Sequence, residues 1–186
     1  MSEHEVTLVR LDVLPAAETG TIAESVRDWL LEREVVAANG RFDPLWQPSA
    51  WKPGLKASEV VGVGWSGSFL HTANNGVDII AERGLYLPVG NDERPRCLIC
   101  SAPAPDSYEQ TCHTWLDRWL REGEEPRFAC GNCRWAAPVG DWAGEFSAAV
   151  GAPAITFHNW PDLTIDFIAE ARARLGGRTT VIRTHI

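Results

Sequence analysis

Four of the five cysteines of this chain form two pairs with the same C-x-x-C spacing. Cys97 and Cys100 make the first pair, Cys130 and Cys133 make the second, and 29 residues separate them. Two such turns brought together place four thiolates at the corners of a tetrahedron, the geometry that Zn²⁺ accepts. The short spacer also makes a tight turn whose backbone N–H groups can stabilise the negative sulfur atoms. The spacing therefore predicts one zinc ion bound by these four cysteines.

The sequence alone leaves other roles open for the two cysteine pairs. Four thiolates also suit a single iron ion, so the metal is inferred only from ligand softness and geometry. Buried, reduced thiols without a metal are a further alternative. A redox-active pair is disfavoured because neither C-x-x-C stands between a clear strand and a long helix. A disulfide framework is disfavoured because the chain has an odd number of cysteines and no visible export signal.

Cys112 and its neighbour His113 are competing ligand candidates. Their segment, DSYEQTCHTWLDRWLRE, carries the capping-box pattern at Ser107 and Gln110 and is expected to be helical. Cys112 then faces a small aromatic core rather than the metal, and His113 lies about 100° round the helix. The aromatic residues that share the face of Cys112 are Tyr108, Trp115 and Trp119.

A zinc ion held by four thiolates is expected to be structural. A catalytic zinc keeps one position open for water or substrate and usually has histidine or carboxylate ligands. Four thiolates close that shell. Binding of this kind contributes on the order of 10 kcal/mol to folding, which matters for an insert too small for its own core.

The cysteine segment resembles a zinc ribbon whose two knuckles are separated by an inserted helix. It departs from the commonest ribbon pattern, C-P-x-C-G, because Leu98 and Ser101 stand where proline and glycine often do. The wider chain, with FHNWP at residues 157–161 and a terminal strand–helix–strand, is similar to bacterial proteins with no assigned activity. The resemblance implies zinc and a cytoplasmic location, and nothing about chemistry.

Two further patterns have weaker links to chemistry. The run GVGWSG at residues 62–67 matches G-x-G-x-x-G, but the following SFLHTANNG does not have the pattern of the helix that a dinucleotide site needs. Ser66, Ser68, His71 and Asp78 are residue types used in nucleophilic catalysis. Linear proximity does not show that these groups meet, so loop hydrogen bonding is their expected role.

Two histidines near the C-terminus belong to predicted strands. His158 lies in AITFHNW and His185 in TTVIRTHI. They approach each other if those two strands pair. A surface position or a hydrogen bond in the core is the expected role of each.

The elements that position these residues are readable mainly at the two ends of the chain. VTLVRLDVL at residues 6–14 predicts a strand, and the capping box of Thr21 and Glu24 opens a helix. Near the C-terminus a strand at 154–160, a helix capped by Asp162 and a strand at 179–186 follow in turn. This order predicts an α+β fold with helices packed on one face of a mixed sheet, with a ferredoxin-like arrangement as the nearest named form.

The middle of the chain is less regular. Residues 42–76 are rich in Pro, Gly and Trp and are expected to form loops with short strands, whereas residues 77–88 have the pattern of a hairpin. Residues 94–135 form the cysteine-bearing insert. The expected organisation is thus one α+β domain made of residues 1–93 and 136–186, interrupted by that insert.

Composition and charge limit the function classes. The chain has 186 residues and a formal net charge of −8. No apolar run is long enough to span a membrane and no signal peptide is visible, so a cytoplasmic protein is expected. No region has the excess of Lys and Arg that nucleic-acid binding needs. Most of the negative charge falls in residues 1–93, which favours a basic protein as partner.

The nine tryptophans include six in loops or at the ends of elements, where they cover the core or contact a partner. These six are Trp46, Trp51, Trp65, Trp135, Trp142 and Trp160. The sequence as a whole favours a non-catalytic, zinc-containing protein-binding or regulatory accessory module. The competing interpretation is a small enzyme with its site in residues 42–76 and His71 or His158 as the acid–base group. The oligomeric state stays open.

Overall fold

The computed structural model describes residues 4–41, 48–62, 67–72, 74–88, 94–144 and 148–185. The helices in these ranges are α1 (Ala16–Glu32), α2 (Tyr108–Glu122) and α3 (Ile165–Leu175), with the 3₁₀ turns η1 (Ala57–Glu59), η2 (Gly67–His71) and η3 (Val139–Asp141). The strands are β1 (His4–Arg10), β2 (Val36–Ala38), β3 (Trp51–Pro53), β4 (Gly76–Ile80), β5 (Gly84–Tyr86), β6 (Arg127–Ala129), β7 (Ala136–Pro138), β8 (Ala149–Gly151), β9 (Ala154–His158) and β10 (Thr179–His185). Within the same ranges, no helix has the length and apolarity needed to cross a membrane.

Six strands form the main sheet, in the order β10-β1-β9-β4-β3-β2. Two β-α-β units interlock in it, because β9 lies between β1 and β4 while β1 lies between β9 and β10. This is the split β-α-β topology of ferredoxin-like folds, and the predicted α+β class is confirmed. The expected mixed sheet is corrected to an antiparallel one. Each crossover skips one position in the sheet, so parallel strands never become neighbours.

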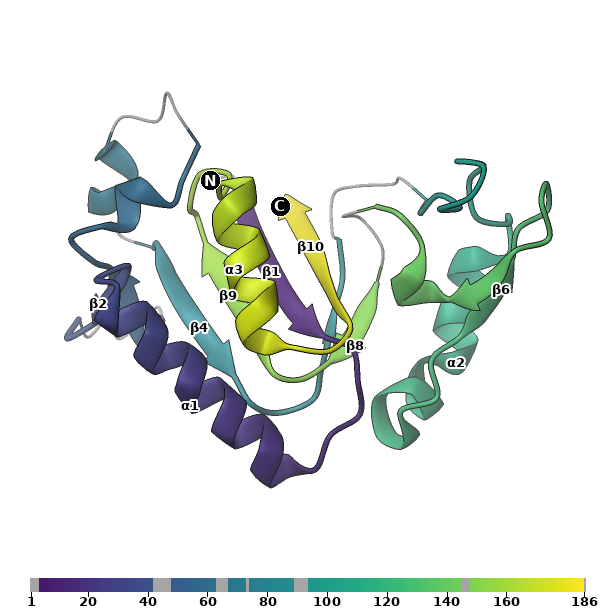
Figure 1. Ribbon diagram of the computed structural model, residues 1–186, viewed down its shortest axis with the longest axis horizontal. Coiled ribbons are helices and arrows are strands. Elements are labelled where there is room, and N and C mark those ends of the chain that lie inside the picture. The colour runs from purple at the N-terminus through teal and green to yellow at the C-terminus, as the bar shows by residue number, and fades with distance from the viewer. Residues whose placement is uncertain are drawn as a thin grey trace.

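α1 and α3 lie side by side on one face of this sheet (Figure 1). Alternate residues of the central strands point toward the two helices, and among them Leu8 and Phe157 are 0% exposed. Trp29 of α1 stacks on Phe167 of α3 with 5.4 Å between ring centroids. The helices therefore cover the apolar face of the sheet, as the sequence predicts.

The helix starts differ from those that the capping patterns predict. α1 begins at Ala16, five residues before Thr21, and the Thr21 hydroxyl donates to the backbone oxygen of Ala17 within the helix. α3 is capped by Thr164, whose hydroxyl accepts a hydrogen bond from the Phe167 amide, and not by Asp162. Several capping-type residues occur near each start, and packing of the apolar face decides which one serves.

The hairpin predicted at residues 77–88 is wrong. β4 pairs with β9 and β3, whereas β5 pairs with β8. β4 and β5 therefore do not pair with each other. They follow one another along the chain, and each pairs with a different strand, β9 and β8. Local alternation identifies strands but not their partners.

A second hydrophobic cluster lies outside the main sheet, in the body that contains α2, β6 and β7 (Figure 1). Trp119 of α2 is 1% exposed, and Phe128 of β6 packs against Tyr108 with 5.2 Å between ring centroids. This body interrupts the chain between β4 and β9. The domain boundaries drawn from the sequence stay a prediction.

The loop tryptophans within the described residues cover the two cores. Trp142 and Trp160 are 4% and 1% exposed, and Trp51 and Trp135 are partly buried against the hydrophobic clusters. Trp46 and Trp65 lie outside the described residues. The four described side chains therefore form no exposed aromatic patch, and their use as partner contacts is not supported.

Candidate metal centre

The first cysteine pair sits in a tight loop closed by backbone hydrogen bonds. The amide of Ser101 donates to the Cys97 carbonyl over 2.9 Å, and the Cys97 amide donates to the Ala102 carbonyl over 2.8 Å. The Ile99 amide also points at the Cys97 sulfur, at 3.4 Å. Backbone geometry thus holds both cysteines on one side of the loop.

The second pair repeats this pattern in the loop between β6 and β7. The Arg134 amide donates to the Cys130 carbonyl over 2.9 Å, and the Cys130 amide donates to the Trp135 carbonyl over 2.7 Å. The residue after the second cysteine has a positive φ in both loops, +59° at Ser101 and +63° at Arg134. Glycine adopts that conformation most readily, which explains why the usual motif has glycine there.

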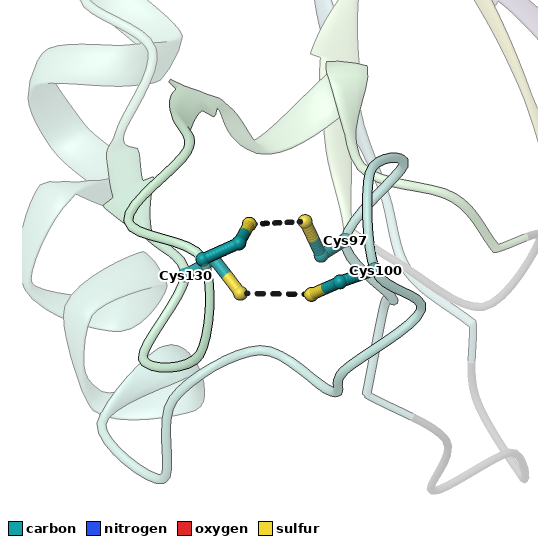
Figure 2. A group of neighbouring side chains, drawn as sticks. Cys97, Cys100 and Cys130 are labelled. Atoms are coloured by element: carbon teal, nitrogen blue, oxygen red, sulfur yellow. Dashed lines mark hydrogen bonds between the residues drawn. The ribbon is translucent and has the colours of Figure 1, made fainter.

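The two loops bring the four sulfur atoms together. Cys97 and Cys133 approach to 3.6 Å between sulfurs, and Cys100 and Cys130 to 3.5 Å. All four sulfurs lie within 4.8 Å of one another, and the predicted group is therefore confirmed as a cluster at metal-binding distance. Figure 2 shows Cys97 and Cys100 on one loop, facing the loop of Cys130.

These sulfur distances fit a metal site better than disulfides. A disulfide bond is about 2.05 Å long, so neither close pair is bonded. A tetrahedral zinc with bonds of about 2.3 Å sets its sulfur ligands about 3.8 Å apart. Exposure rises across the cluster from 1% at Cys97 and 2% at Cys130 to the exposed Cys133. The site therefore lies at the surface end of the second hydrophobic cluster.

The surroundings of the cluster shift the pKa values of two of its cysteines in opposite directions. The Ala102 amide is the main cause that lowers the pKa of Cys100, to about 6. The Trp135 amide lowers the pKa of Cys133, but burial and the three neighbouring sulfurs raise it to about 12. Four thiolates this close repel one another, and a divalent ion at their centre would offset that repulsion.

The competing ligands lie elsewhere. Cys112 is 9% exposed and packs in the second hydrophobic cluster, where burial raises the pKa of its thiol to about 11. His113 is exposed on α2. Neither belongs to the group of four close ligand atoms. The helical spacing thus placed Cys112 correctly in the core.

An ionic cluster joins this body to the main sheet. Arg178, just before β10, donates to Glu125 over 3.0 Å and to Asp141 over 2.7 Å. The Arg178 backbone amide also donates to Asp12, over 3.0 Å. Glu125 is only 12% exposed and accepts a further hydrogen bond from the Gly140 amide over 2.6 Å. The cysteine-bearing body is therefore held to the sheet by polar contacts.

His158 does not have the surroundings of an acid–base catalyst. Its Nδ1 lies 2.8 Å from Glu5 and its Nε2 lies 2.9 Å from Asp78, so both ring nitrogens are engaged. Burial lowers the pKa of His158, but the hydrogen bonds to Asp78 and Glu5 outweigh it and raise the pKa to about 9. The ring is thus a protonated bridge across three strands. His185 does not approach it, because β1 separates their strands, and stacks on His4 instead.

His71 is exposed beside a cavity of about 440 Å³. The described residues that line this cavity include Lys52, Arg41 and Asn75 but no carboxylate. Asp78 is engaged with His158 instead of His71. Ser66 and residues 63–65 of the glycine-rich motif lie outside the described residues, and a 3₁₀ turn, not an α-helix, follows them.

Comparisons with known proteins do not extend these observations. Protein-family models, curated proteins and solved structures contain no match to this chain. The assignment of the site rests on its geometry, in which two loops with the same hydrogen-bonding pattern bring four cysteine sulfurs together. The arrangement is a candidate metal centre.

Proposed function

We propose that Cys97, Cys100, Cys130 and Cys133 bind one Zn²⁺ and that their two loops form a zinc ribbon. The observation that carries this proposal is the approach of four sulfurs to within 4.8 Å on two matching loops. Thiolates with tetrahedral geometry suit Zn²⁺, and iron is the alternative that direct analysis separates.

The zinc is structural in this proposal. Four thiolates fill its coordination shell, so no position remains for water or substrate. The body around it has short strands and a small core, and its share of folding energy from apolar burial is correspondingly limited. Zinc binding worth on the order of 10 kcal/mol would supply the remainder.

Metal analysis of the purified protein tests this assignment. We expect one zinc per chain in the wild type and loss of zinc in Cys97→Ser. Cys112→Ala is the matched control, because this fifth cysteine is buried away from the site and should leave the metal content unchanged. Folded wild-type protein without stoichiometric metal would overturn the zinc site, and stoichiometric iron would overturn the identity of the ion.

For the whole chain we propose a non-catalytic protein-binding or regulatory accessory role in a reducing bacterial cytoplasm. Both ring nitrogens of His158 are hydrogen-bonded to carboxylates. No described residue that lines the cavity beside His71 is a carboxylate. Both observations support a non-catalytic protein. None of the five cysteines is in a disulfide, which fits a reducing compartment. The net charge of −8 favours a basic partner.

Cross-linking in the native cell followed by mass spectrometry tests this role. We expect one partner to cross-link reproducibly to the wild type and to be lost with Cys97→Ser, while Cys112→Ala retains it. A chain that turns over a small molecule, with activity removed by His71→Ala, would instead support the enzyme interpretation. The cavity beside His71 is the single observation in favour of that alternative.

A further inference from the structure

The cavity of about 440 Å³ beside His71 lies at the ends of β2 and β3. These strands are at the opposite end of the molecule from the body with α2 and β6 (Figure 1). One wall is formed by residues 39–41 and 52–53, and the other by residues 70–72 and Asn75, at and after the turn η2. Pockets for small molecules have volumes of about 300–1,000 Å³, so this cavity is large enough for a small organic ligand.

The charged side chains that line this cavity are basic, although the chain as a whole is acidic. Arg41, Lys52 and His71 line it and are exposed. No Asp or Glu belongs to the described part of the lining. In the whole chain, by contrast, 25 acidic residues outnumber 17 Lys and Arg. The lining is thus a local positive site, and an anion is the ligand that complements it.

Lys52 is the cation whose surroundings are clearest. The chain has only one other lysine, Lys56, which pairs with Glu34 over 2.7 Å between Nζ and the carboxylate oxygen. Among the described residues, no carboxylate lies within ion-pair distance of Lys52. The backbone of Lys52 is fixed in β3 by its pairing with Ala37 of β2. Its ammonium group is therefore open to a ligand in the cavity.

Hydrogen bonds from two asparagine side chains fix the walls. The Asn39 side-chain amide donates to the Ser49 carbonyl over 2.9 Å, and its oxygen accepts from the Arg41 backbone amide over 3.2 Å. Asn75, which is 8% exposed, donates to the Phe69 carbonyl of η2. Both walls are thus held by the protein itself, which lowers the entropic cost of ordering the site when a ligand binds.

The rest of the lining indicates what kind of anion fits. Thr72 and the two asparagines are polar, and only Leu70 and Pro53 are apolar among the described lining residues. These residues include no aromatic ring on which a nucleobase would stack. A phosphate monoester carries a charge of about −1.5 to −2 at pH 7, so it gains more than a carboxylate from several neighbouring cations. The complementary ligand is therefore a compact organic phosphate with hydroxyl groups.

We propose that this cavity binds such a ligand, of which a sugar phosphate is an example, and that Arg41, Lys52 and His71 hold its phosphate group. The site is separate from the metal centre and goes beyond the proposed protein-binding role. We assign no reaction to it, since the described lining offers no carboxylate as a partner for His71.

The two lysines offer a matched pair of variants. Lys52→Gln and Lys56→Gln each remove one positive charge, so any general effect of net charge is the same in both. Only Lys52 lines the cavity. Lys52→Gln should weaken binding about tenfold, as expected for the loss of one hydrogen bond to a charged group, whereas Lys56→Gln should leave it unchanged. His71→Gln, on the opposite wall, should also weaken binding.

Calorimetric titration measures the binding of glycerol 3-phosphate, ribose 5-phosphate and glucose 6-phosphate to the full chain and to each variant, with circular dichroism to confirm folding. Lysine labelled with ¹³C at Cε gives one NMR signal for each of the two lysines. We expect at least one of the three phosphates to bind and to shift the signal of Lys52 but not that of Lys56. Glycerol, ribose and glucose should not bind, and inorganic phosphate and citrate should bind more weakly.

Four results would overturn the proposal. These are the absence of binding by all three organic phosphates, equal binding to Lys52→Gln and Lys56→Gln, a ligand-induced shift of the Lys56 signal alone, and binding of inorganic phosphate or citrate at least as tight as that of the organic phosphates. The last result would mean that the cavity does not recognise the hydroxyl-bearing body of the ligand.

Discussion

The proton held by His158 between two carboxylates should make the fold more stable at pH 6 than at pH 9. The pKa of His158 is raised from 6.5 to about 9 in the folded chain. The folded protein therefore binds one more proton than the unfolded chain between these values. The stabilisation is fully present below pH 6.5 and is lost as the pH rises through 9.

The magnitude follows from the same two values. At 1.36 kcal/mol per pH unit, the interval from 6.5 to about 9 sets an upper limit of about 3 kcal/mol. The His158 side chain is 25% exposed, so solvent reduces this limit only partly. His158→Gln keeps a hydrogen-bonding side chain and removes the titrating proton. It should lower the free energy of unfolding by up to about 3 kcal/mol at pH 6 and by much less above pH 9.

Urea denaturation at several pH values measures this difference directly. Groups other than His158 contribute equally to the wild type and the variant, so their pH dependence cancels in the comparison. His71→Gln is the control, because this histidine is exposed and should behave as the wild type. A difference between wild type and His158→Gln that does not change with pH, or a ring titration near 6.5 by NMR, would refute the reasoning.

Three other predictions concern backbone and ionic contacts. Ser101→Gly and Arg134→Gly should each raise stability by about 0.5–1 kcal/mol in thermal denaturation, because both positions have positive φ; lower stability would contradict this. Arg178→Gln should cost about 1–2 kcal/mol and speed hydrogen exchange in residues 124–144, since Glu125 and Asp141 lose their ion pairs with the guanidinium. Unchanged exchange would refute the proposed attachment. Gly151→Ala should cost about 3 kcal/mol, because its Cβ would lie 2.0 Å from the backbone oxygen of Arg10. The control Gly20→Ala should not destabilise the protein, because nothing lies within 4 Å of its added Cβ. Equal stabilities of the two variants would disprove the clash.

The candidate metal site was predictable from the sequence because it depends on spacing. A C-x-x-C pair is a local turn, and the same turn occurs at Cys97 and at Cys130. Helical periodicity likewise placed Cys112 in a core, where it is 9% exposed. The α+β class followed from the order of elements at the chain ends. The C-x-x-C turns and the helical periodicity depend only on residues that are close together in the sequence.

Strand partners and histidine environments could not be predicted in this way. The pairing of β5 with β8, and the bridging of Glu5 and Asp78 by His158, join residues far apart in the chain. No local pattern carries that information, because alternation is the same whichever strand lies beside it.

The sequence by itself determined the pair of cysteine turns, the helices with their apolar faces and the excess of negative charge. Only the tertiary structure decided that the sheet is antiparallel, that His158 is occupied by two carboxylates, and that Lys52 and His71 line one cavity. The physical reason is that side-chain periodicity and turn geometry are local. Hydrogen-bond partners and shared cavities arise only when distant segments pack together.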